Sequence, residues 1–158
     1  MSDTNDNNKT NAPAIDLGQL VEGAGDGICV CDARGNIILW NAACERIFGF
    51  SREEAMGRSL DLIIPERQRQ RHWDGYEKTM ETGITRYGTT LLKVPSLHKD
   101  GHTISIAFTV SLLKGSDGKV NAIVAMVRDE TERFQEERKL RARLAEAERM
   151  INSTGDAR

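Results

Sequence analysis

The run from Thr103 to Leu113 constrains the fold more than any other segment of this sequence, because large apolar and small side chains alternate along it. A period of two predicts a β-strand with one buried face. Turn sequences bound the run on both sides, Lys99-Asp100-Gly101 before it and Ser116-Asp117-Gly118 after it. They predict antiparallel neighbours at 86–94, which Pro95 is expected to interrupt, and at 120–127.

The first half of the chain predicts a hairpin followed by short helices. Segments 28–32 and 37–40 are apolar, and a turn containing Gly35 separates them. Helices are expected at 41–49, at the serine–glutamate capping box that begins at Ser51, and at 66–82 between Pro65 and Gly83. The order predicts an α+β fold, in which a five-stranded antiparallel sheet carries short helices on one face and has flanking helices at both ends.

The C-terminal segment has a different composition, since 14 of the 22 residues from Arg128 to Arg149 are charged. Apolar side chains recur there at intervals of four, three and four residues, which predicts a polar helix with a narrow apolar seam: Leu140, Leu144, Ala147 and Ile151. The expected organisation is a disordered tail at 1–13, an N-terminal flanking helix at 14–26, a central domain at 27–128, an amphipathic helix at 129–151 and a tail at 152–158.

Composition excludes several functional classes. A chain of 158 residues fits one domain, and a formal net charge of −2 argues against nucleic-acid binding through bulk electrostatics. No apolar run approaches the length of a membrane helix, and three cysteines do not suggest a disulfide framework. Neither a phosphate-binding loop nor a Ser/His/Asp arrangement is evident. We therefore expect a cytoplasmic protein that is not an enzyme and binds neither membrane nor nucleic acid.

A set of short motifs in a fixed order resembles the PAS sensor family over about Leu20 to Phe134. The motifs are Asp26-Gly27-Ile28, Asp32-x-x-Gly35-x-Ile37, Trp40-Asn41-x-Ala43-x-Glu45-x-x-Phe48-Gly49, Gly57, Lys99-Asp100-Gly101 and Arg128-Asp129-x-Thr131. The resemblance implies a small-molecule or redox sensor, commonly a homodimer through its flanking helices. It implies a signalling partner acting in trans, either a histidine kinase or a regulator, as in a two-component system or the regulation of transcription.

Within that family, His72 resembles the histidine that ligates iron in heme-bearing oxygen sensors. Lys99 follows His72 by 27 residues, which is similar to the spacing in those proteins. The resemblance implies heme b, with His72 as the metal ligand. Leu92 occupies the position at which the oxygen sensors carry an oxygen-binding arginine. Thr90 occupies the position at which a methionine can be the second ligand of the iron. We therefore expect a less polar site that is suited to carbon monoxide or nitric oxide. The candidate cofactor-binding residues are His72, Tyr76, Leu92, Ile106, Phe108 and Met126.

Other interpretations of these residues remain open. His72, Tyr76 and Met80 form a stripe that is also typical of an ordinary core-facing helix. The chain lacks the reactive-cysteine motif of the light-sensing relatives, which argues against flavin photochemistry through a cysteine adduct. Noncovalent flavin is a weaker candidate than heme, with Trp40 and Asn41 as candidate pocket residues. Cys29 and Cys31 are expected to be buried small residues.

Two functional hypotheses follow. In the first, a ligand shifts the sheet, and Asp129 and Thr131, which are expected to cap the last helix and tie it to the sheet, transmit the change to that helix. In the second, the pocket is filled by the protein's own side chains. The helices at Ile15–Val21 and Leu140–Ile151 then mediate dimerisation or partner docking without a ligand.

Overall fold

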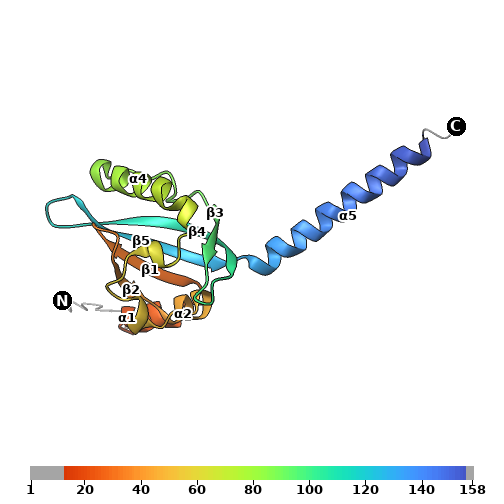
Figure 1. Cartoon of the computed structure of the whole chain (residues 1–158). Coiled ribbons are helices and arrows are strands. Elements are labelled where there is room, and N and C mark those ends of the chain that lie inside the picture. The colour runs from red at the N-terminus through yellow and green to blue at the C-terminus, as the bar shows by residue number, and fades with distance from the viewer. Residues whose placement is uncertain (1–12, 156–158) are drawn as a thin grey trace, which may run out of the picture.

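The computed structural model describes residues 13–155, and within them a single sheet carries helices on one side (Figure 1). The elements in chain order are α1 (Leu17–Gly23), β1 (Gly27–Asp32), β2 (Ile37–Trp40), α2 (Ala42–Phe48), α3 (Arg52–Ala55), a 3₁₀ turn η1 (Leu60–Leu62), α4 (Glu66–Thr82), β3 (Leu92–Leu97), β4 (Thr103–Lys114), β5 (Val120–Asp129) and α5 (Thr131–Gly155).

The five strands are antiparallel throughout and lie in the order β2-β1-β5-β4-β3, which confirms the predicted architecture. The first and last strands are neighbours in the middle of the sheet, and Gly27 at the start of β1 pairs with Val127 near the end of β5. Both flanking helices therefore join the domain at the same end of the sheet.

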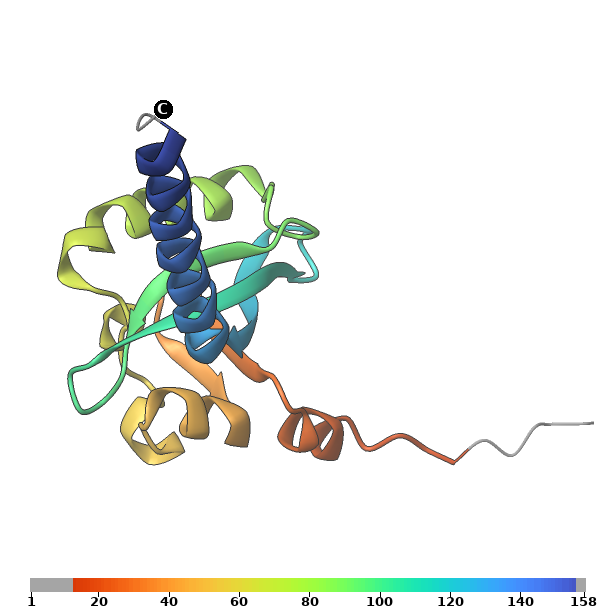
Figure 2. The same cartoon turned by 90° about the vertical axis from the view of Figure 1, so that its right-hand side faces the viewer.

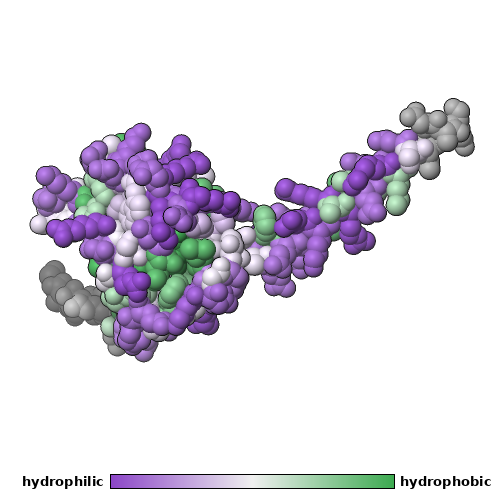
Figure 3. All heavy atoms as spheres, viewed as in Figure 1, coloured by the Kyte–Doolittle hydropathy of each residue, from purple (hydrophilic) through white to green (hydrophobic). Residues whose placement is uncertain are grey.

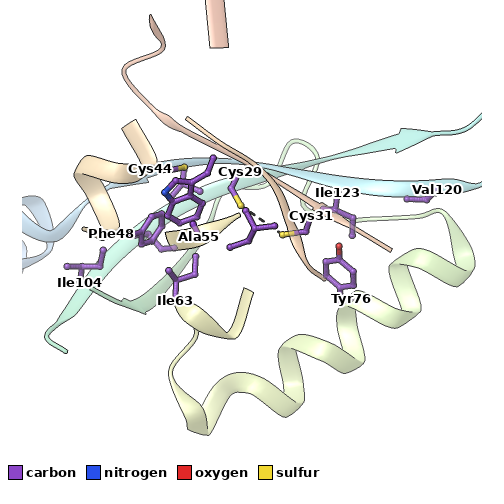
Figure 4. Packing of buried hydrophobic residues seen from close by; sticks show 14 residues of the cluster. Cys29, Cys31, Cys44, Phe48, Ala55, Ile63, Tyr76, Ile104, Val120 and Ile123 are labelled. Atoms are coloured by element: carbon purple, nitrogen blue, oxygen red, sulfur yellow. Dashed lines mark hydrogen bonds between the residues drawn. The ribbon is translucent and has the colours of Figure 1, made fainter. Parts of the chain in front are cut away.

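The core lies between the inner face of the sheet and the helices α2, α3 and α4. Trp40, Phe48 and Ile37 are essentially inaccessible to solvent, and the rings of Trp40 and Phe48 pack at 5.2 Å. Figure 4 shows Tyr76 reaching from α4 toward the strands, opposite Cys31 and Ile123. Burial of these apolar side chains is the main stabilising contribution to such a fold.

Side-chain caps fix the short helices. The Asn41 side chain is fully buried; its Oδ1 accepts hydrogen bonds from the backbone N–H groups of Cys44 and Ile28, and its Nδ2 donates to the carbonyls of Val21 and Asp26. One amide thus caps α2 and ties it to β1 and to the end of α1. The capping box of Ser51 and Glu54 forms as predicted.

The prediction of a strand over 86–94 that ends at Pro95 is wrong. The strand β3 begins at Leu92, runs through Pro95 and ends at Leu97. Proline is tolerated because β3 is an edge strand, so its missing N–H removes no hydrogen bond from a second neighbour. Residues 86–91 form a turn instead, although the carbonyl of Tyr87 still accepts a hydrogen bond from the backbone of Val110.

The flanking helices differ in length from the prediction. The helix α1 covers Leu17–Gly23 only, whereas α5 continues to Gly155, so residues 152–155 are helical and not part of a tail. The predicted tail at 1–13 lies outside the described residues except for Pro13. The helix α5 projects away from the sheet in Figure 1, and Figure 2 turns this side of the molecule toward the viewer. No helix in the described part of the chain has the length and apolar character that crossing a bilayer requires.

Candidate functional site

The candidate site lies along the inward-facing side of α4, a helix whose bounds match the prediction. Pro65 precedes its first turn, and Gly83 closes it in a left-handed conformation with φ of 66°. Trp73 Nε1 donates to Asp61 Oδ1 at 2.8 Å, and the Tyr76 hydroxyl donates to the carbonyl of Asp32 at 2.5 Å. These two hydrogen bonds hold α4 against η1 and against the end of β1.

His72 lies beside these two aromatic side chains, whose rings also contact each other. Its ring centroid is 4.6 Å from that of Trp73 and 5.9 Å from that of Tyr76. Its Nδ1 atom is buried and has no hydrogen-bond partner among the described residues. Burial lowers the pKa of His72 below its usual 6.5, and the negative charge of Asp61 opposes that shift only in part. The imidazole is therefore neutral at pH 7, which is the form that ligates a metal ion.

The turn between β1 and β2 packs directly on α4. Gly35 has φ of 81°, and a Cβ atom at this position would lie 2.2 Å from the ring of Trp73. Only glycine permits both this backbone conformation and this contact.

Three of the predicted lining residues share the inner face of the sheet. Ile106 belongs to the buried core cluster, and Phe108 is partly buried against it. Leu92 pairs with Phe108 in the register of β3 and β4, which places both on one face. The prediction for Met126 is wrong: it alternates with the core residue Val127, and half of its surface is exposed on the outer face. Apolar residues occupy both faces of β5, so hydropathy gave no signal for the face.

An open groove of about 480 Å³ lies beside the site, between α4 and the first hairpin turn. His72 does not line it. The sequence did not predict this groove. The signal that could have indicated it is the i, i+4 spacing of Glu77 and Glu81, which lie on the same face of α4 as Trp73 and Tyr76. The lining residues are Ala33, Arg34, Trp73, Tyr76, Glu77, Met80 and Glu81.

Asp129 and Thr131 form a joint between the sheet and α5. Asp129 Oδ1 accepts hydrogen bonds from the backbone N–H of Thr131 at 2.9 Å and from its hydroxyl at 2.5 Å. The same hydroxyl oxygen accepts from the N–H of Ser105 at 3.0 Å, and the Ser105 carbonyl accepts from the N–H of Glu130 at 2.8 Å. The first turn of α5 is thereby tied to β4 as well as to β5.

A second contact ties the start of β1 to the end of β5. The guanidinium of Arg128 donates to both carboxylate oxygens of Asp26, at 2.9 and 2.7 Å. These hydrogen bonds hold the pKa of Asp26 below its usual value of 3.8. The two flanking segments are therefore connected by one bidentate ion pair.

The three cysteines are buried and free, as expected for Cys29 and Cys31. The sulfur atoms of Cys29 and Cys31 lie 4.0 Å apart on the inner face of β1 (Figure 4). Burial raises the pKa of the Cys44 thiol to about 12. Protonated, enclosed thiols of this kind pack as small apolar groups.

Comparison with known proteins places this geometry in a family. The PAS fold model matches residues 16–129. The sensor protein FixL of Bradyrhizobium diazoefficiens is 32% identical over 123 residues, covering 73% of this chain and 22% of FixL. The oxygen sensor protein DosP of Escherichia coli is 29% identical over 103 residues, covering 65% of this chain and 13% of DosP. The chain thus spans less than a quarter of the length of either relative.

A solved structure gives the same fold. The crystal structure of the PAS domain of a protein from Colwellia psychrerythraea aligns with a TM-score of 0.65 at 24% identity, covering 73% of this chain and 95% of that one. The family model matches most of the chain, and the strand order and helix placement agree with that fold. The chain belongs to the PAS family.

Proposed function

We propose that this chain is a PAS sensor module that binds a small ligand between α4 and the sheet, with heme b held by His72 as the candidate ligand. The single observation that carries the proposal is the buried Nδ1 atom of His72, which has no partner within residues 13–155. Buried polar atoms in proteins nearly always have a partner. We therefore take this buried, unsatisfied imidazole nitrogen as the indication of a ligand.

The chemistry of the surrounding residues supports heme. The neutral imidazole of His72 supplies the nitrogen donor, and the inner face of the sheet supplies apolar contacts from Ile106 and Phe108. When bound, heme iron would provide a site for a diatomic gas or a redox change. Leu92 offers no hydrogen-bond donor on that face, which favours carbon monoxide or nitric oxide over oxygen. FixL and DosP, both named as sensors, support the sensory role.

The proposed output passes through the joint at Asp129 and Thr131 to α5. A ligand that displaces β4 would act on the first turn of α5 through Ser105, because the backbone of Ser105 is hydrogen-bonded to both Glu130 and Thr131. The module itself would carry no catalytic activity. It would act in the cytoplasm as a homodimer, on a histidine kinase or regulator in trans.

The test is an ultraviolet–visible spectrum of the purified protein after addition of hemin and removal of the excess. We expect a sharp Soret band in the wild type and in His102→Ala, and its loss in His72→Ala. His102→Ala is the matched control because His102 is exposed on the turn between β3 and β4 and does not belong to α4. A circular dichroism spectrum checks that each variant is folded. Equal bands in all three proteins, or none in the wild type, would contradict the assignment of heme to His72.

A ligand-free interaction module is the second candidate, and one observation favours it. The hydroxyl of Tyr76 on α4 donates a hydrogen bond to the carbonyl of Asp32 at the end of β1, and the ring of Trp73 packs against Gly35. In this hypothesis the core is complete without a ligand. Absence of a Soret band together with concentration-dependent dimerisation would support it.

A further inference from the structure

The turn between β3 and β4 brings together two imidazoles and one carboxylate. Nδ1 of His98 lies 3.1 Å from Asp100 Oδ1, and Nδ1 of His102 contacts the same oxygen. The two rings stack with their centroids 4.6 Å apart. One ligand atom from each residue lies within 4.8 Å of the other two. The sequence places these residues around a turn, but the convergence of their donor atoms is visible only in the structure.

The Nδ1 atom of His98 faces both the backbone N–H and the carboxylate of Asp100. Its Nδ1 accepts a hydrogen bond from the backbone N–H of Asp100 at 3.3 Å, which requires a lone pair on that nitrogen. The same atom faces the carboxylate of Asp100 at 3.1 Å, and a carboxylate oxygen is also an acceptor. The lone pair on Nδ1 that accepts the backbone hydrogen bond is also the one that a bound metal ion would use.

The turn is held in place by contacts outside the cluster. The backbone N–H of Lys99 donates to the carbonyl of Phe48 at 2.8 Å, and the Lys99 ammonium pairs with Glu54. The ring of His98 packs where a side chain on Gly49 would stand. Ligands on a fixed turn lose little conformational freedom on binding a metal ion. The side chains of His102 and Asp100 are 55% and 61% exposed, so an ion can enter from solvent and keep water ligands.

We propose that His98, Asp100 and His102 form a binding site for a divalent transition-metal ion of the zinc class. Two imidazole nitrogens and one carboxylate oxygen are a donor set that Zn²⁺ prefers and that Mg²⁺ and Ca²⁺ do not. Nδ1 of His98 and Oδ1 of Asp100, which lie 3.1 Å apart, would make an angle of about 95° at an ion that lies about 2.1 Å from each of them. Water molecules would complete the coordination. The site is separate from His72 and does not depend on heme.

The chain contains a matched control for the carboxylate. Asp117 occupies the corresponding turn before β5, and its Oδ1 accepts from the N–H of Lys119 at 3.0 Å, as Asp100 Oδ1 accepts from the N–H of His102 at 3.0 Å. No histidine lies in that second turn. Asp100→Asn and Asp117→Asn therefore perturb turns of the same kind, but only the first removes a proposed metal ligand.

The experiment is isothermal titration calorimetry of the tag-free, EDTA-treated chain with ZnCl₂, in a phosphine reductant that keeps the cysteines free. We expect one Zn²⁺ per wild-type and per Asp117→Asn chain. Affinity should fall at least tenfold in His102→Ala and in Asp100→Asn, and MgCl₂ should give no binding. The absorption of bound Co²⁺ in the visible should be lost in the same variants. Zinc binding that is absent in the wild type, or unchanged in the His98→Ala/His102→Ala variant, would overturn the proposal.

Discussion

At the scale of single residues, Gly35 shows how one missing side chain positions the candidate site. Its backbone is in the left-handed region, which disfavours other residues, and the ring of Trp73 occupies the space that a side chain at this position would need. Trp73 in turn contacts His72 and Tyr76, so the packing of the whole aromatic group depends on this glycine.

We predict that Gly35→Ala destabilises the domain more than Gly118→Ala. Both glycines have a positive φ, 81° and 76°, so both substitutions incur the cost of a left-handed alanine, about 1–2 kcal/mol. Gly118 has open space around it, whereas alanine at 35 would also displace Trp73. The free energy of unfolding in urea should therefore fall by about 1–3 kcal/mol more in Gly35→Ala. Equal losses in the two variants would show that the contact with Trp73 is unimportant.

At the scale of elements, the ion pair of Asp26 and Arg128 links α1 and β1 to the end of β5. Because the pKa of Asp26 is lower in the folded chain than in the unfolded chain, its contribution to stability is present above pH 3.8. That contribution disappears as the pH falls through the lowered pKa. Both side chains are more than 40% exposed, so solvent screening keeps this contribution small.

We predict that Asp26→Asn lowers the free energy of unfolding at pH 7 and that the difference from wild type shrinks below pH 3.8. A double-mutant cycle with Arg128→Gln, measured by urea unfolding at several pH values, isolates the pair. In the Arg128→Gln background, Asp26→Asn should have little further effect. A difference from wild type that stays constant down to acid pH would contradict the assigned role of the carboxylate.

The elements differ in how far the sequence could predict them. Pro65 and Gly83 define the ends of α4, and alternation defines β4, because these local signals agree with the tertiary structure. The sequence could not place Met126, since β5 has apolar side chains on both faces. It also could not show that His98, Asp100 and His102 converge, because that depends on side-chain rotamers rather than on spacing.

At the scale of the whole molecule, α5 presents apolar side chains that its own domain does not cover. Phe134, Leu140 and Leu144 are more than half exposed, and hydrophilic residues make up most of the face of this helix that Figure 3 shows. An isolated helix with so narrow an apolar seam is marginally stable in water. Pairing with a second copy of α5 would bury the seam.

We predict that the chain dimerises through α5 and that Leu140→Ser weakens the dimer at least tenfold. Arg141→Ser is the matched control, because it changes the neighbouring position off the seam. Sedimentation equilibrium over a range of concentrations measures both dissociation constants. If Leu140→Ser and wild type dissociate alike, the interface lies elsewhere on the molecule.

The joint at Asp129 and Thr131 makes α5 a lever. Its 25 residues span about 37 Å at 1.5 Å per residue, and hydrogen bonds to the sheet hold its base. A rotation of about 5° at that base would move the far end by roughly 3 Å, a displacement larger than most ligand-induced shifts within a packed core. In the proposed sensor, a small displacement at Ser105 would therefore produce a larger displacement at the end of the helix.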